Sequence, residues 1–184
     1  MPATEAEATE FKTKLLARLV TDTQTLKDQW TPQIMDINGS YGGLVALMNE
    51  QREKVAKAAS QEEESRYSQR TMKDIRDNLA GTQEIYALFE PWLKSKSGGA
   101  AIDTAVLGGF TKLGNDYATV QGDGVPEPPS TWSSESPSAA DLQTPFGQLF
   151  ESVNSAVDPN QKGSVVDEMN KAAVALGLTQ FSDN

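Results

Sequence analysis

The sequence predicts an all-α protein, an up-down helical bundle of four main helices with shorter helices added. Apolar residues recur every three or four positions through most of the chain, which is the period of a helix face. No run alternates apolar and polar residues for long enough to predict a strand. At 184 residues the chain has the length of one domain, and we expect residues 1–184 to form a single helical-bundle domain.

The first predicted helix runs from Thr9 to Trp30, with its charged residues opposite an apolar face. That face consists of Phe11, Leu15, Leu16, Leu19, Val20, Leu26 and Trp30. The helix should end at Thr31, because the residue before a proline is disfavoured in the α conformation. An irregular stretch is expected through Asn38-Gly39-Ser40, and a second helix should begin near Tyr41.

The clearest helical pattern lies between residues 72 and 93. Its apolar positions are Met72, Ile75, Leu79, Thr82, Tyr86, Phe89 and Leu93. This spacing predicts one continuous helix that ends in residues 94–96, before the Gly98-Gly99 break. The next helix should cover residues 102–120. Its glycines, Gly108, Gly109 and Gly114, each cost about 1 kcal/mol relative to alanine, so we expect them where a neighbour packs closely.

Residues 121–140 form a Gly/Pro/Ser-rich segment that predicts a long surface loop. Its tryptophan, Trp132, is expected to pack back onto the bundle, although a partner-binding loop tip is the alternative. Two shorter helices should follow, over residues 141–157 and 163–176, with a turn at residues 158–160 between them.

Composition limits the chemistry that the protein can perform. The chain has 16 Lys plus Arg against 26 Asp plus Glu, a net charge of −10 that disfavours nucleic acid. It has no histidine and no cysteine, which excludes Ser-His-Asp, Cys-His and zincin sites. We therefore expect no catalytic residue, no metal-ligand set and no cofactor. No segment approaches the roughly 18 apolar residues of a membrane span.

One polar group of interest lies around residues 62–67. The carboxylates of Glu63 and Glu64, beside Arg66 and Tyr67, could bind a hard cation weakly through oxygen. Ser60 with Glu63 three residues later is also a capping box, and a capped helix start is the favoured interpretation.

A second polar group is formed by Asp74 and Asn78, one helical turn apart, together with Asp77. Aspartate is a poor helix former in mid-helix, so these residues need a reason to be there. The favoured reason is an ion pair or cap that involves Arg66, Arg70 or Arg76, and a binding site is the alternative.

The segment from Lys54 to Leu93 resembles the second half of the imelysin-type domain, a family that includes the EfeO and EfeM type periplasmic components of iron uptake. The matching positions are Lys54-Val55-Ala56-Lys57, Glu63-Glu64-Ser65-Arg66-Tyr67-Ser68, Asp74-Ile75, Asn78, Gly81, Gln83, Ile85, Leu88, Pro91 and Leu93. The closing segment Ala173-x-x-Leu176-Gly177-Leu178 is also similar to that of the family.

The resemblance implies a bundle that corresponds to the C-terminal half of a bilobal domain. The family's proposed metal motif, His-x-x-Glu, belongs to the other half, and no position here matches it. Glu63, Glu64, Arg66, Tyr67, Asp74 and Asn78 are therefore candidate interface or groove residues only. The chain is either a fragment that needs a partner half or a self-standing half that forms a homodimer, which we favour.

These inferences lead to a non-enzymatic, periplasmic or secreted binding module linked to uptake of iron or another cation. The alternative is a structural or protein-interaction domain that has lost metal binding. A carboxylate-only hydrolase is a third, less favoured interpretation.

Overall fold

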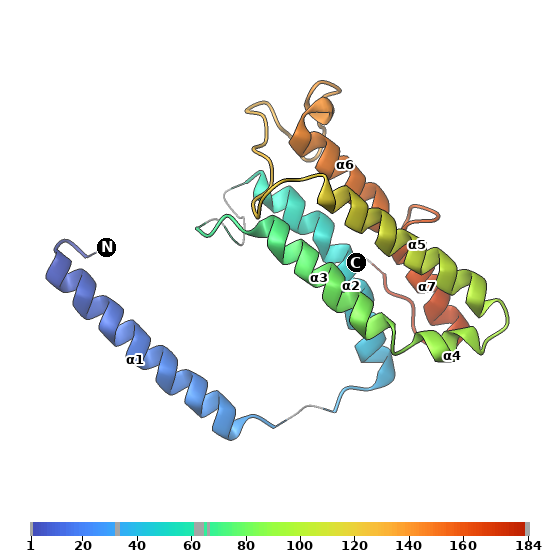
Figure 1. Cartoon of the computed structure of the whole chain (residues 1–184), viewed down its shortest axis with the longest axis horizontal. Helices are drawn as coiled ribbons and strands as arrows, with labels where there is room; N and C mark the ends of the chain where they lie inside the picture. Colours follow the sequence, from blue (N-terminus) through green and yellow to red (C-terminus); the bar gives the residue numbers. More distant parts are fainter. Residues whose placement is uncertain (1, 32–33, 61–64, 66, 183–184) are drawn as a thin grey trace. The chain divides into compact units, whose positions relative to one another are not determined.

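The structure, a computed structural model, describes residues 2–31, 34–60, 65, 67–182. Every regular element within these residues is a helix, so the predicted all-α class is confirmed. The chain divides into two units, Met1–Met35 and Asp36–Asn184. The first holds helix α1, and the second holds helices α2 to α7 (Figure 1).

Helix α1 spans Glu5–Gln29 and begins four residues earlier than predicted. A capping box fixes this start: the Thr4 hydroxyl accepts from the Glu7 N–H at 3.2 Å, and the Glu7 carboxylate accepts from the Thr4 N–H at 3.3 Å. The helix ends before Trp30, which is extended. Within its unit α1 buries none of its residues, and the predicted apolar side chains are all more than half exposed. The single-domain expectation therefore stays a prediction.

Helix α2 spans Ile37–Ala58, so the irregular stretch expected at residues 38–40 is wrong. Asp36 is the cause, because its carboxylate accepts from the Gly39 N–H at 2.6 Å and caps the helix three residues before that glycine. A glycine in a capped first turn does not interrupt the helix. The pattern Asn-Gly-Ser is typical of a turn by itself, but after Asp36 it forms the first turn of a capped helix.

The single helix predicted over residues 72–93 is two helices, α3 at Thr71–Tyr86 and α4 at Glu90–Lys94. Pro91 explains the break, since its ring lacks an N–H and would clash with the carbonyl of residue 87 in a continuous helix. Phe89, which precedes α4, and Leu93, which lies in it, are nevertheless both buried in the core. The apolar spacing thus identified the core residues correctly and the backbone wrongly.

Helix α5 spans Gly99–Ala118 and follows a tight connection from α4. Gly98 has a φ of 75°, the left-handed region that favours glycine. Gly109 confirms the expected close packing, because a Cβ atom there would lie 2.9 Å from the Val165 Cβ. At Gly108 the expectation is wrong, since nothing lies within 4 Å of the same position, and at Gly114 the neighbour is at an ordinary 3.7 Å.

Residues 121–140 form no helix or strand, as predicted, and a short 3₁₀ turn at Asp141–Gln143 leads into helix α6, Pro145–Val157. The start of α6 is later than predicted because Thr144 caps it and Pro145 suits its first position. Helix α7 spans Val165–Leu176. In this unit α2 contacts α3, α6 and α7, and α5 contacts the same three helices, which encloses the core (Figure 1).

Trp132 packs back onto the bundle as expected, with its ring edge-on to Phe146 at 4.8 Å and to Phe150 at 4.9 Å between centroids. Asp141 closes the base of this loop, because its carboxylate accepts from the Thr131 hydroxyl at 2.6 Å and the Ser138 hydroxyl at 2.7 Å. These two hydrogen bonds hold the pKa of Asp141 below its ordinary value.

Acidification is expected to destabilise the protein partly through Asp141. A carboxylate with a lowered folded pKa contributes stability above its unfolded pKa, near 4, and that contribution is lost as the pH falls through the folded value. We expect Asp141→Asn to flatten the fall in unfolding temperature between about pH 4 and pH 2. Thermal unfolding followed by circular dichroism across this range measures the effect, and an unchanged slope in the variant would contradict it.

Tyr117 and Gln51 form a polar contact inside the core, where the Tyr117 hydroxyl donates to the Gln51 side-chain oxygen. Burial raises the pKa of Tyr117, so the hydroxyl stays protonated and remains a donor. Gln51 is fully buried, and its amide nitrogen donates to the Met48 sulfur at 3.1 Å. The contact ties α5 to α2.

Tyr117→Phe should leave the Gln51 oxygen without this donor and lower the free energy of unfolding by about 1.5 kcal/mol. Urea unfolding of the variant and the parent measures this difference. A loss below a few tenths of a kcal/mol would show that the oxygen finds another donor.

Candidate functional site

Half of the candidate residues singled out in the sequence lie outside the part of the chain that the structure describes. Glu63, Glu64 and Arg66 lie outside the described residues, so the pairing of Ser60 with Glu63 in a capping box stays a prediction. The helix that carries Asp74 begins at Thr71, and Ser60 instead closes α2, donating from its hydroxyl to the Lys57 carbonyl at 2.9 Å.

The remaining candidates are Tyr67, Asp74 and Asn78. Tyr67 is 92% exposed, in the turn before α3. Asp74 and Asn78 lie one turn apart on α3, where Asp74 is exposed and Asn78 is half-buried. Their role as a groove or interface stays a prediction.

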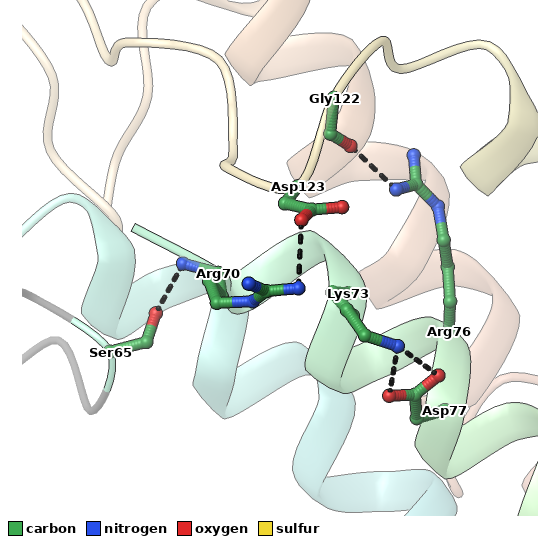
Figure 2. Close-up of polar contacts among 7 residues, drawn as sticks. All are labelled: Ser65, Arg70, Lys73, Arg76, Asp77, Gly122 and Asp123. Carbon is green, nitrogen blue, oxygen red and sulfur yellow. Dashed lines mark hydrogen bonds and ion pairs between the residues drawn. The ribbon is translucent and has the colours of Figure 1, made fainter. Parts of the chain in front are cut away.

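Two of the three arginines that were expected to pair with Asp74 have other partners, and the third, Arg66, lies outside the described residues. Arg70 forms an ion pair with Asp123, with a nitrogen–oxygen distance of 3.0 Å (Figure 2). The guanidinium of Arg76 donates to three carbonyl oxygens: Tyr117 at 3.0 Å, Val120 at 2.6 Å and Gly122 at 2.6 Å. The structure thus gives Arg70 and Arg76 partners other than Asp74, and a pairing of Asp74 with Arg66 stays a prediction. We call Arg70 and Arg76 the arginine clamp.

The arginine clamp holds the segment 117–123 by hydrogen bonds and an ion pair. This segment consists of the end of α5 and the residues that follow it, and it passes the start of α3. The Lys73 N–H adds a backbone hydrogen bond to the Asp123 carbonyl at 3.1 Å. Just beyond, a Cβ atom at Gly124 would lie 3.1 Å from the Gln69 carbonyl, so the two chain segments touch. The polar side chains at the start of α3 thus fix the path of a distant loop.

The start of α3 is itself held by the turn before it. The Ser65 hydroxyl lies 2.6 Å from that of Thr71 and accepts from the Arg70 N–H at 3.1 Å (Figure 2). Lys73 and Asp77 form a separate pair one turn apart on the exposed face of α3, at 2.7 Å. The pair with Lys73 explains why an aspartate occupies position 77 in the helix.

On the other side of the clamped segment lies an open pocket of about 530 Å³. Its wall comes from the end of α5, the segment 119–126 and the first half of α6. The lining residues are Asp116, Thr119, Val120, Gln121, Gly124, Val125, Pro126, Pro145, Gln148, Leu149 and Ser152. The pocket combines one carboxylate with hydroxyl, amide and apolar groups, which is the composition of a binding site for an amphipathic group.

Asp116 is the charged residue of this pocket and is 29% exposed. Its Oδ2 atom accepts from the Lys112 ammonium at 2.8 Å and also from the Ser152 hydroxyl. Sequence reasoning missed the pocket. The available signal was the Lys112/Asp116 pair at helical spacing, but the same spacing occurs at Lys73/Asp77 on a plain surface, so it does not identify a site.

Across the described ranges, no three His, Cys, Asp or Glu side chains come close enough to hold a metal ion. In that part of the chain no helix has both the length and the apolar character that crossing a membrane requires.

A family model described as imelysin, which carries a peptidase designation, matches residues 3–170. No curated protein and no solved structure matches the chain. The matched range reaches well before the segment on which the resemblance rested, and it includes all of α1.

Proposed function

Because the chain belongs to the imelysin family, we propose that it is a non-enzymatic, extracytoplasmic binding module linked to the uptake of iron or another cation. The observation that carries the binding role is the pocket of about 530 Å³ beside Asp116, whose wall is fixed by the arginine clamp. The net charge of −10 supports a cationic ligand, because the field of the protein attracts positive charge.

The family's peptidase designation does not lead us to propose catalysis. The chain has no imidazole and no thiol, the groups that most often act as base or nucleophile near neutral pH. In the pocket, the Ser152 hydroxyl donates a hydrogen bond to Asp116, a carboxylate that also accepts from the Lys112 ammonium. This arrangement supports binding, since nothing in it resembles a serine activated by a neighbouring strong base.

The cation-uptake part of the proposal is tested by calorimetric titration with ferric, zinc and calcium ions. Saturable binding at micromolar metal would support it. The expected ligands are hard oxygen donors, so ferric ion or calcium should bind before zinc. A flat titration with all three ions would remove cation binding and leave the interaction role below.

The alternative is a structural or protein-interaction domain that has lost metal binding, as a half-domain or a homodimer. Helix α1 favours it, because Phe11 and Leu19 are each 60% exposed within their unit and an amphipathic helix gains most of its stability by burying its apolar face. Light scattering at tens of micromolar protein tests the homodimer. A monomeric mass would contradict it.

A further inference from the structure

Building on the proposed role as a binding module, we propose that the pocket beside Asp116 binds a lysine side chain of a partner protein. The ammonium group would bind the Asp116 carboxylate, and the aliphatic stem would lie against the apolar residues of the pocket. The partner is thus recognised by an exposed basic residue.

The carboxylate of Asp116 is oriented and has acceptor capacity left. Both of its neighbours, the Lys112 ammonium and the Ser152 hydroxyl, donate to Oδ2. Its Oδ1 atom accepts no hydrogen bond from the described residues, although an ionised carboxylate has about four acceptor positions. An incoming ammonium can therefore bind Oδ1 while Ser152 holds the carboxylate in place.

The rest of the pocket suits the stem of a lysine. Val120, Val125 and Leu149 line it together with the rings of Pro126 and Pro145. Lysine buries its methylene groups along apolar surface while its ammonium stays at a polar, partly hydrated position. A small inorganic cation would leave this apolar lining in contact with water, so the lining favours an organic cation.

The wall of the pocket is fixed before any ligand arrives. Arg76 holds the carbonyls of Tyr117, Val120 and Gly122, and Arg70 holds Asp123. A lysine side chain binding here therefore loses its own freedom but does not have to order the segment 119–123, which lowers the cost of binding.

Lys112 is a local competitor for the carboxylate. Its side chain is 63% exposed and its pair with Asp116 is a surface pair at helical spacing, a kind that contributes little to stability. Removing this ammonium should make Asp116 a stronger acceptor for a ligand. A variant that removes the Lys112 ammonium should therefore strengthen ligand binding, whereas a variant that removes the Asp116 carboxylate should weaken it.

The experiment is a nuclear magnetic resonance titration of the whole chain with Nα-acetyl-lysine N-methylamide, followed through backbone amide shifts. Saturable shifts in the millimolar range are expected at Thr119, Gln121 and Ser152. Nα-acetyl-norleucine N-methylamide, which has an aliphatic side chain without the ammonium, should give no saturable shift. Equal binding of both probes, or shifts spread evenly over the surface, would overturn the proposal.

Three variants sharpen this titration. Asp116→Asn should weaken binding of the lysine probe about tenfold, the effect of one charge-assisted hydrogen bond. Asp77→Asn, which removes a carboxylate from an equivalent lysine pair on α3, should leave binding unchanged. Lys112→Gln should strengthen it about twofold, the size expected for loss of a weak surface competitor. Loss of binding in Asp77→Asn, or no change in Asp116→Asn and Lys112→Gln, would contradict the proposal.

The lysine titration and the metal titration can contradict their two proposals independently of each other. Saturable metal binding without binding of the lysine probe would overturn the lysine pocket and leave the cation-uptake proposal standing. Binding of the lysine probe with a flat metal titration would do the reverse.

Discussion

Gly99→Ala is expected to lower the free energy of unfolding by about 3 kcal/mol, the upper part of the range for overpacking a core. A Cβ atom at Gly99 would lie 1.8 Å from the Leu93 carbonyl oxygen and 2.8 Å from its carbonyl carbon. Because the obstacle is backbone, no side-chain rotation can relieve the contact, and the α4–α5 connection has to move. Urea unfolding followed at 222 nm measures the loss.

Gly108→Ala, in the same helix, is the matched control with the opposite sign. Nothing lies within 4 Å of the added Cβ atom, and Gly108 is exposed in the middle of α5. Alanine is about 1 kcal/mol more favourable than glycine in a helix interior, so this variant should be more stable than the parent. Equal stabilities of the Gly99 and Gly108 variants would show that the α4–α5 connection does not enclose Gly99 as described.

Arg76→Ala should cost about 2.5 kcal/mol of unfolding free energy, since it removes three charge-assisted hydrogen bonds to partly hydrated carbonyls. The loss should concentrate in the segment 117–123, which the guanidinium holds. Hydrogen exchange of the amides around Val120 should therefore accelerate more than exchange in α7. Chemical denaturation gives the total cost, and exchange measurements give its location.

Two variants control the Arg76 measurement. Lys73→Ala removes a cation from the same helix but only a surface pair, so its cost should stay within about 0.5 kcal/mol. Arg76→Lys keeps the charge but lacks the planar fork that reaches several carbonyls, and should fall between parent and Arg76→Ala. A lysine variant as stable as the parent would show that charge alone holds the segment.

Local signals in the sequence predicted the helices of the second unit well, because the apolar spacing that defines a helix face there also defines what is buried. Leu79 and Leu93 are in the core as expected. The breaks were predicted less well. The apolar periodicity of residues 72–93 predicted one helix although Pro91 interrupts it, and the residues after Asp36 predicted a turn although Asp36 caps a helix there. A single residue decides each of these helix boundaries, and a pattern taken over many residues does not detect it.

The candidate site could not be predicted, because it depends on contacts between distant segments. Arg76 and Gly122 are 46 positions apart, and nothing in either neighbourhood indicates the other. Arginines near Asp74 in the sequence suggested a local ion pair, because residues three or four positions apart on a helix can pair without any contact between distant segments. The fold instead uses Arg76 to hold the carbonyls of Tyr117 and Val120 at the end of α5, and it pairs Arg70 with Asp123.

Because Arg76 belongs to α3, the stability of the last turn of α5 depends on a contact with another helix. Carbonyl oxygens at a helix end carry partial negative charge, and many helices offset it with a basic residue of their own, but the last turn of α5 contains none. Its neutralising charge comes from α3, 41 positions earlier in the chain. An isolated α5 peptide should therefore fray at Tyr117, and in the whole chain this turn should form only when α3 docks, which links helix completion to helix association in one cooperative step.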